Sequence, residues 1–212
     1  MKKYNKIDKV LWPLRKAVLR LMVKTLANPN PNPWDKAETY IPKRKYGSGC
    51  IHEWPWYFDG QSNVTVNSLE DICHWLKSCQ YCEDQKLFLE DDFWQHPVTF
   101  ENLKKGDCED HSLWAWRKLT EIGIHSEFII GRIVVDKILN STRHAFVAFE
   151  KNNERFILES VAKDKNEIVL PFEEVKNSFN PELSVDGDLK TYLYAGHLIS
   201  LMKSKKSNKG RC

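Results

Sequence analysis

Residues 105–119, KGDCEDHSLWAWRKL, carry the strongest helix signal in the chain and its most unusual cysteine. Apolar side chains recur at helical spacing through this stretch, and Gly123 follows it as a C-terminal cap. The pattern predicts a helix from Cys108 to about Ile122. The cysteine therefore stands in the first turn of a predicted helix.

Cys108 is placed there to act as a nucleophile. The free N–H groups and the dipole at a helix N-terminus favour an anion, and such sites lower a thiol pKa from about 8.5 to roughly 3.5–7.5. The neighbouring Asp107, Glu109 and Asp110 oppose this, because negative charge disfavours a thiolate. The same charges stabilise a helix N-terminus. From the motif alone, a reactive and a structural cysteine are equally supported.

A histidine and a carboxylate that complete a catalytic set follow on two predicted strands. His144 begins a run of β-branched and aromatic residues, and Glu159 lies near the end of the next run. If the two runs pair as a hairpin, these side chains lie near one another. A cysteine nucleophile needs a histidine base and a third group that fixes the imidazole. Cys108, His144 and Glu159 are therefore the candidate catalytic residues.

The predicted elements favour an α+β fold with an antiparallel sheet. Ser68, with Asp71 three residues later, predicts the start of a helix of roughly three turns. The helix that begins at Cys108 is followed by three strand-like runs, residues 126–135, 143–150 and 155–161, which turn-forming residues separate.

Composition indicates a folded globular protein. The 212 residues are 42% hydrophobic and include eight Trp but only nine Gly and nine Pro. The net charge of +3 is small and much of it lies near the ends of the chain, so no nucleic-acid partner is expected.

The cysteines predict a reducing compartment. There are six, at irregular spacing, which is unlike a small disulfide-bonded scaffold. Four neighbouring residues offer an alternative, because C-x-x-C is the usual first half of a zinc site; they are Cys73, His74, Cys79 and Cys82. No second half completes that site in the sequence.

The two ends of the chain differ from its middle. Residues 1–34 predict an amphipathic helix over 10–26 and a Pro-rich linker, and residues 201–212 predict a basic disordered tail. The domain is expected at 35–200. The helix is interrupted by Lys and Arg, so it is neither a clean signal peptide nor a transmembrane segment, and a cytoplasmic location is expected. It can pack on its own domain, on an anionic membrane or in a partner's groove.

Four motifs resemble the transglutaminase-like superfamily, most closely its bacterial transglutaminase-like cysteine proteinases. The resemblance spans roughly residues 87–162 and rests on DDFWQHP (91–97), GDCEDHS (106–112), HAFV (144–147) and ILES (157–160). It implies a papain-like core in which the cysteine tops a helix packed on an antiparallel sheet. It also implies that Cys108 is the nucleophile, His144 the general base and acid, and Glu159 the orienting carboxylate.

One residue departs from the superfamily's pattern. The third member is usually Asp, and Glu159 is longer by one methylene, which changes its reach to the imidazole. Glu serves in some hydrolase triads, so the assignment is kept. Asp164 is the nearest alternative downstream.

The resemblance adds two further sets of residues. It implies that the indole of Trp94 or the amide of Gln95 assists the backbone N–H of Cys108 in binding an oxyanion, with core packing as the other role for Trp94. It also implies that Asp107 and Glu109 can hold calcium, although two carboxylates fall short of the six to eight oxygens that Ca²⁺ takes, and helix capping is the stronger interpretation.

The sequence thus predicts an enzyme, a transglutaminase-like cysteine peptidase that cleaves a peptide or isopeptide bond of a protein or peptide substrate. The chemistry proceeds through a thioester and requires no cofactor. Two alternatives stay open: a protein-glutamine transamidase on the same fold, and a non-catalytic peptide-binding domain.

Overall fold

The computed structural model describes residues 32–135, 138–140, 142–162 and 168–209, with side chains up to Met202. The predicted N-terminal amphipathic helix, most of the Pro-rich linker and Asp164 lie outside the described residues. All of the residues predicted to form the site lie inside them.

The elements follow one another along the chain in the order β1 (Lys36–Glu38), η1 (Lys43–Lys45), η2 (Trp54–Phe58), α2 (Leu69–Lys77), β2 (Gln80–Tyr81), α3 (Asp84–Leu87), α4 (Pro97–Leu103), β3 (Lys105–Gly106), α5 (Cys108–Glu121), β4 (Ser126–Val135), β5 (Ile138–Leu139), β6 (His144–Lys151), β7 (Glu154–Leu158), β8 (Val169–Pro171), α7 (Phe172–Val175), β9 (Phe179–Asp186), β10 (Thr191–Tyr194) and α8 (Ala195–Lys209).

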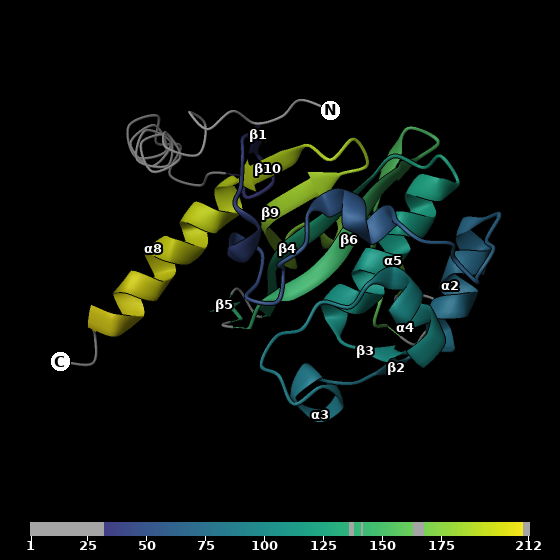
Figure 1. Cartoon of the computed structure of the whole chain (residues 1–212). Helices are drawn as coiled ribbons and strands as arrows, with labels where there is room; N and C mark the ends of the chain where they lie inside the picture. The colour runs from purple at the N-terminus through teal and green to yellow at the C-terminus, as the bar shows by residue number, and fades with distance from the viewer. Residues whose placement is uncertain (1–31, 136–137, 141, 163–167, 210–212) are drawn as a thin grey trace.

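An eight-stranded sheet forms the centre of the described chain (Figure 1). Its order is β1-β10-β9-β4-β6-β7-β8, β5 pairs with the end of β4, and all of these pairs are antiparallel. The predicted mixture of helix and antiparallel sheet is confirmed. The short parallel pair β2–β3 is a feature that the sequence does not reveal.

α5 packs against the sheet, mainly on β6 and β4, and α2 and α4 pack on α5 (Figure 1). Successive strand residues point to opposite faces. In β4, Phe128 belongs to the core that α5 covers, whereas Ile129 belongs to the core on the other face. Trp114 and Trp116 of α5 are fully buried in the first core. This burial fixes α5 relative to β6.

Local capping confirms two predicted helix boundaries. The hydroxyl of Ser68 accepts a hydrogen bond from the backbone N–H of Asp71 at 3.1 Å and begins α2. Gly123 follows α5 with φ of +77°, a conformation that glycine adopts without steric cost. α4 was not evident from the sequence, because it has only seven residues and its cap is the imidazole of His96.

The last described helix extends into the segment predicted as a basic disordered tail. α8 continues through Lys209. α8 packs on β9, where Leu198 and Ser200 are buried, and the Lys residues that follow favour helix. In the described part of the chain, no helix combines the length and the apolar character that a membrane crossing requires.

Candidate active site

The first turn of α5 presents Cys108 between two capping aspartates. Asp107 is the N-cap residue, Cys108 is the first helical residue, and Asp107 and Asp110 form a reciprocal capping box. The backbone N–H of Asp107 donates to Asp110 Oδ2 at 3.3 Å. The helix capping expected of Asp107 is therefore present, with Asp110 and not Glu109 as its partner.

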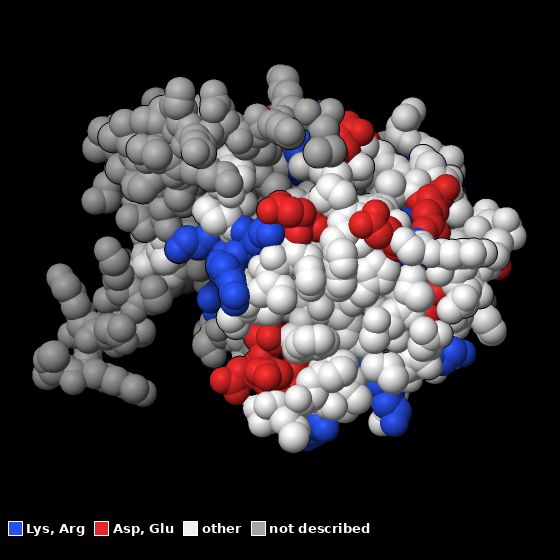
Figure 2. Space-filling model, viewed as in Figure 1, with Lys and Arg blue, Asp and Glu red and all other residues white. Residues whose placement is uncertain are grey.

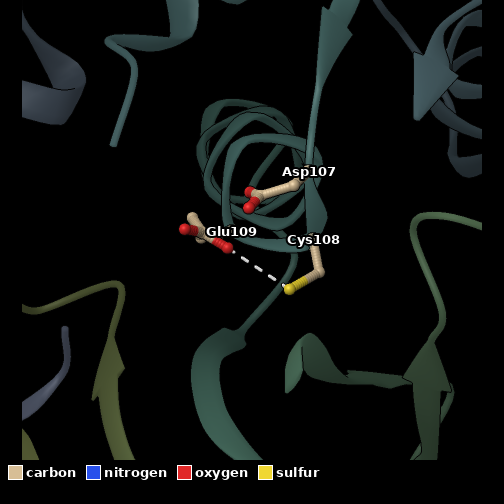
Figure 3. A group of neighbouring side chains, drawn as sticks. All are labelled: Asp107, Cys108 and Glu109. Atoms are coloured by element: carbon tan, nitrogen blue, oxygen red, sulfur yellow. Dashed lines mark hydrogen bonds between the residues drawn. The ribbon is translucent and has the colours of Figure 1, made fainter. Parts of the chain in front are cut away.

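The Cys108 thiol lies beside a carboxylate. Its Sγ donates to Glu109 Oε2 at 3.2 Å, and Figure 3 shows this contact at the end of α5 with Asp107 next to it. Burial raises the pKa of the Cys108 thiol well above its ordinary value, and the charges of Glu109 and Asp107 raise it further. A hydrogen bond from the backbone N–H of Ala145 acts in the opposite direction. The helix N-terminus alone therefore does not produce a thiolate here.

His144 and Glu159 are brought together by the β6–β7 hairpin, as predicted. The two strands pair in antiparallel register, and His144 Nε2 lies 2.7 Å from Glu159 Oε2. Both side chains are only 14% exposed. An ionised carboxylate only accepts, so His144 Nε2 is the donor and Nδ1 is left with a lone pair. This is the tautomer that a general base requires.

Cys108 and His144 belong to elements that pack on each other. The hydrogen bond to the Cys108 sulfur comes from Ala145, the residue that follows His144 in β6. The N-terminus of α5 is thus at the beginning of β6, and Glu159 directly follows β7, the strand that pairs with β6.

The two side chains predicted to bind an oxyanion are used elsewhere. The indole Nε1–H of Trp94 donates to Asp92 Oδ1 at 2.8 Å, and Trp94 is buried in the core. The Gln95 amide donates to the backbone oxygen of Lys105 and to Asp110 Oδ2. An indole has one N–H and an amide two, so neither side chain keeps a free donor. Core packing, the other role expected of Trp94, is the one the structure has.

Carboxylates from three segments converge on the first turn of α5. One oxygen each of Asp84, Asp92 and Glu109 lie within 4.8 Å of one another. The same is true of Asp84, Asp107 and Asp110. These five residues are called the acidic cluster below. Of the five, only Asp107 and Glu109 were identified as ligands from the sequence.

The acidic cluster is electrostatically strained. Burial raises the pKa of Asp84 to about 7, and the charges of Asp107 and Asp92 add to this. Burial also raises the pKa values of Asp107, Glu109 and Asp110. In Asp92 burial acts in the same direction, but hydrogen bonds from Gly49, Ser48 and Trp94 leave its pKa below the ordinary value.

Two oxygens of the acidic cluster point to a ligand. Asp84 Oδ1 and Asp107 Oδ1 are buried and have no hydrogen-bond partner among the described residues. Buried carboxylate oxygens without donors are costly. Hard oxygen ligands of this kind suit Ca²⁺. The residues present therefore fit a calcium ion better than the sequence alone suggested.

The sequence contained a signal for two residues of the acidic cluster that were not predicted as ligands. Asp92 lies in the DDFWQHP motif and Asp110 in GDCEDHS, and both motifs were recognised without a ligand role for these residues. Asp84 has no such signal, because it is positioned by the turn into α3.

The alternative zinc site does not form. Among the described residues, the groups of three or more converging ligand atoms all belong to Cys108 or the acidic cluster. Cys79 Sγ instead donates to the backbone oxygen of Trp75, and Cys82 Sγ to that of Glu83. The five cysteines of the described chain are free thiols.

A pocket of about 400 Å³ opens beside the acidic cluster. Asp92 forms part of its wall, and His52 stacks on Trp56 with ring centroids 3.7 Å apart. Ile51 and Phe93 line it and are exposed by 49% and 41%. The pocket thus joins an acidic wall residue, Asp92, to exposed apolar surface.

The chain is similar to solved structures of Legionella pneumophila LapG. The EGTA-treated form is 21% identical over 68% of this chain and 75% of that one, with a TM-score of 0.43. The calcium-bound form is 19% identical over 78% and 82%, also with a TM-score of 0.43. No protein-family model and no curated protein matches the chain. The activity inferred below rests on the side chains described above.

Proposed function

We propose that this chain is a thiol hydrolase that cleaves a peptide or isopeptide bond, with Cys108 as nucleophile, His144 as general base and acid, and Glu159 as the group that orients the imidazole. The proposal includes a papain-like arrangement of α5 on β6 and β7, within a domain of residues 35–200. The observation that carries it is the 2.7 Å contact between His144 Nε2 and Glu159 Oε2 beside the helix that presents Cys108.

Acylation would begin at the Cys108 thiol. His144 Nδ1 takes the thiol proton, Sγ bonds to the substrate carbonyl carbon, and the carbonyl oxygen becomes an oxyanion. His144 then gives its proton to the leaving amine as the C–N bond breaks. Glu159 stabilises the imidazolium that exists between these two transfers.

Deacylation would reverse the roles. Water attacks the thioester while His144 Nδ1 takes its proton, the C–S bond breaks, and the proton returns to sulfur as the carboxylic acid leaves. If an amine replaced water, the product would be an amide, so the product's mass separates hydrolysis from transamidation. The His144–Glu159 pair disfavours a purely peptide-binding domain, which has no need for an oriented base.

The pocket beside the acidic cluster supports a peptide substrate. Asp92 in its wall neighbours Glu109, which contacts Cys108. An extended peptide advances about 3.4 Å per residue, so a substrate held at Cys108 reaches this pocket with a side chain a few residues away. Ile51 and Phe93 favour an apolar side chain there.

We further propose that the acidic cluster holds calcium. Asp84, Asp92, Asp107, Glu109 and Asp110 would supply the oxygens. When bound, the ion would supply positive charge beside Cys108. This chain's own residues explain why that matters: Glu109 and Asp107 raise the Cys108 pKa, and their neutralisation would favour the thiolate.

Calcium is expected to raise the melting temperature. A free calcium concentration of 100 times the dissociation constant raises the free energy of unfolding by about 2.7 kcal/mol. This corresponds to a rise in melting temperature of roughly 5–10 °C for a chain of this size. Magnesium should do less, because it demands stricter octahedral geometry. A melting scan at neutral pH with chelator, calcium or magnesium measures this.

The pH dependence follows from the raised pKa of Asp84. In chelator, stability should fall as pH rises from about 4 to about 7, because the folded state keeps a proton that the unfolded state releases. The calcium shift should therefore be larger at pH 7.5 than at pH 5. Asp92→Asn should reduce the rise in melting temperature that calcium produces. Asp91→Asn, at the exposed neighbouring position, should leave that rise unchanged. An equal shift in both variants would argue against the site.

The reactivity of Cys108 tests its activation separately. With calcium present at pH 7.5, iodoacetamide should label Cys108 faster than any other cysteine, because His144 accepts its proton and the neighbouring carboxylates are neutralised. Chelator should slow the labelling of Cys108 far more than that of Cys82, because Glu109 and Asp107 act directly on the Cys108 thiol. Mass mapping after brief exposure measures both rates. Equal rates at the two cysteines under both conditions would exclude an activated Cys108.

A further inference from the structure

A hydrolase of this kind needs two donors for its oxyanion, and the structure leaves one of them unidentified. The backbone N–H of Cys108 in the first turn of α5 is one natural donor. The N–H groups of Trp94 and Gln95 are already engaged. Another group near Cys108 would therefore have to supply the second donor.

Tyr81 is placed there by the parallel pair β2–β3. Tyr81 is in register with Gly106, two residues before Cys108. Bonds on both sides of Tyr81 fix the strand: Gln80 N–H donates to Lys104 and Cys82 N–H to Gly106, each at 2.8 Å. The backbone of Tyr81 is thus held beside the segment that leads into α5.

The side chain of Tyr81 is open and its hydroxyl is available. It is 46% exposed, unlike the buried tyrosines of the core. Within the part of the chain that the structure describes, its hydroxyl makes no side-chain hydrogen bond. A phenol with its ordinary pKa of about 10 is protonated at neutral pH and donates.

The causes of the raised pKa of Tyr81 agree with a position near Cys108. Burial is the first cause that raises the pKa of Tyr81, and the charge of Cys108 is the second, followed by Asp107 and Glu109. Cys108 is thus the ionisable group whose charge acts most strongly on the phenol. The β2–β3 pairing, with these charges in agreement, places Tyr81 beside the segment that leads into the first turn of α5.

We propose that Tyr81 is the second oxyanion donor and hence a further catalytic residue. When the Cys108 sulfur bonds to the substrate carbonyl carbon, the Tyr81 hydroxyl donates to the carbonyl oxygen as it becomes negative. No proton is transferred in this step. The inference rests on the proposed hydrolase function, because it assigns a donor to that reaction.

Tyr81→Phe tests the role with the loss of one oxygen atom. Hydrolysis of a peptide p-nitrophenyl ester should lose about 10²–10³ in kcat with little change in KM, as removal of one oxyanion donor does elsewhere. A peptide aldehyde, whose adduct with the thiol resembles the tetrahedral intermediate, should bind less tightly by a similar factor. Alkylation of Cys108 and the melting temperature should be unchanged, because the hydroxyl is exposed and holds no proton for Cys108.

Matched controls separate the outcomes. Tyr192→Phe, in β10, loses a hydroxyl that donates to Asp186 of β9 and should keep wild-type kcat. If Tyr81→Phe keeps wild-type kcat and aldehyde affinity while Cys108→Ala is inactive, Tyr81 is not the donor and the hydrolase proposal stands. If Cys108→Ala retains turnover, the hydrolase proposal fails and the role of Tyr81 fails with it. A fall in Cys108 alkylation in Tyr81→Phe would also overturn it, since Tyr81 would then be affecting the thiol.

Discussion

Replacement of Cys108 by alanine is expected to lower turnover of a peptide p-nitrophenyl ester by about 10⁶, the size of loss found when a triad nucleophile is removed from a serine protease. His144→Ala should cost nearly as much, and the double variant no more than either. The reason is that the two residues act in a single step, so removal of one leaves the other without a function. Initial rates, with product masses from a peptide library, measure this.

The control for this prediction is another free thiol. Cys82→Ala should keep wild-type turnover, because Cys82 lies outside α5 and its thiol donates to the backbone oxygen of Glu83, which has no role in the proposed reaction. If Cys108→Ala and His144→Ala reduced turnover independently, so that their losses multiplied, the two residues would not share a step. If the wild type bound peptides without turnover and Cys108→Ala bound them equally well, the domain would be a binding module.

Glu159→Gln is expected to lower kcat by about 10⁴, as the equivalent change does in the serine protease triad. The carboxylate accepts the Nε2 proton of His144, and an amide at this position can present an N–H instead. The imidazole would then carry its proton on Nδ1, where it cannot accept from the thiol. The pH profile of kcat should lose its imidazole limb along with the rate.

Two further variants serve as controls for Glu159→Gln. Glu159→Asp restores the residue usual in the superfamily that the sequence resembles, and should lose far less activity than Glu159→Gln. Glu154→Gln, an exposed position at the start of β7, should lose none. Glu159→Gln could instead retain wild-type turnover on a substrate that Cys108→Ala cannot process. The proposed hydrolase activity would then stand, but a residue other than Glu159 would have to orient His144, and Asp164 would be tested next.

Local sequence predicted α5 and the hairpin well. The helix start at Cys108 follows from capping residues within one turn, and the His144–Glu159 contact follows from two adjacent strands joined by a short turn. Each of these is determined by neighbours in the chain. The apolar pattern of α5 did not reveal how completely this helix is buried, because every residue from Glu109 to Leu119 is buried, including the charged Arg117 and Lys118.

Features that depend on distant segments were not predictable in the same way. The acidic cluster brings Asp84 and Asp92 to the cap of α5, and nothing local to either residue indicates that partner. The amide of Gln95 likewise donates to Asp110, 15 residues away, whereas the indole of Trp94 donates to Asp92, only two residues before it. Periodicity reports which face of an element is buried, and it does not report which polar groups meet there.

The position of β4 in the sheet gives the C-terminal quarter of the chain, which contains β9, a role that its side chains do not reveal. Every residue proposed for catalysis or calcium precedes residue 160, yet β4 pairs along one whole side with β9, residues 179–186. A fragment that stopped after Glu159 would keep the complete chemistry but leave the backbone N–H and C=O groups of a long apolar strand unpaired. Such an edge invites pairing with another molecule. The last strands therefore protect the site against aggregation without contributing an atom to it.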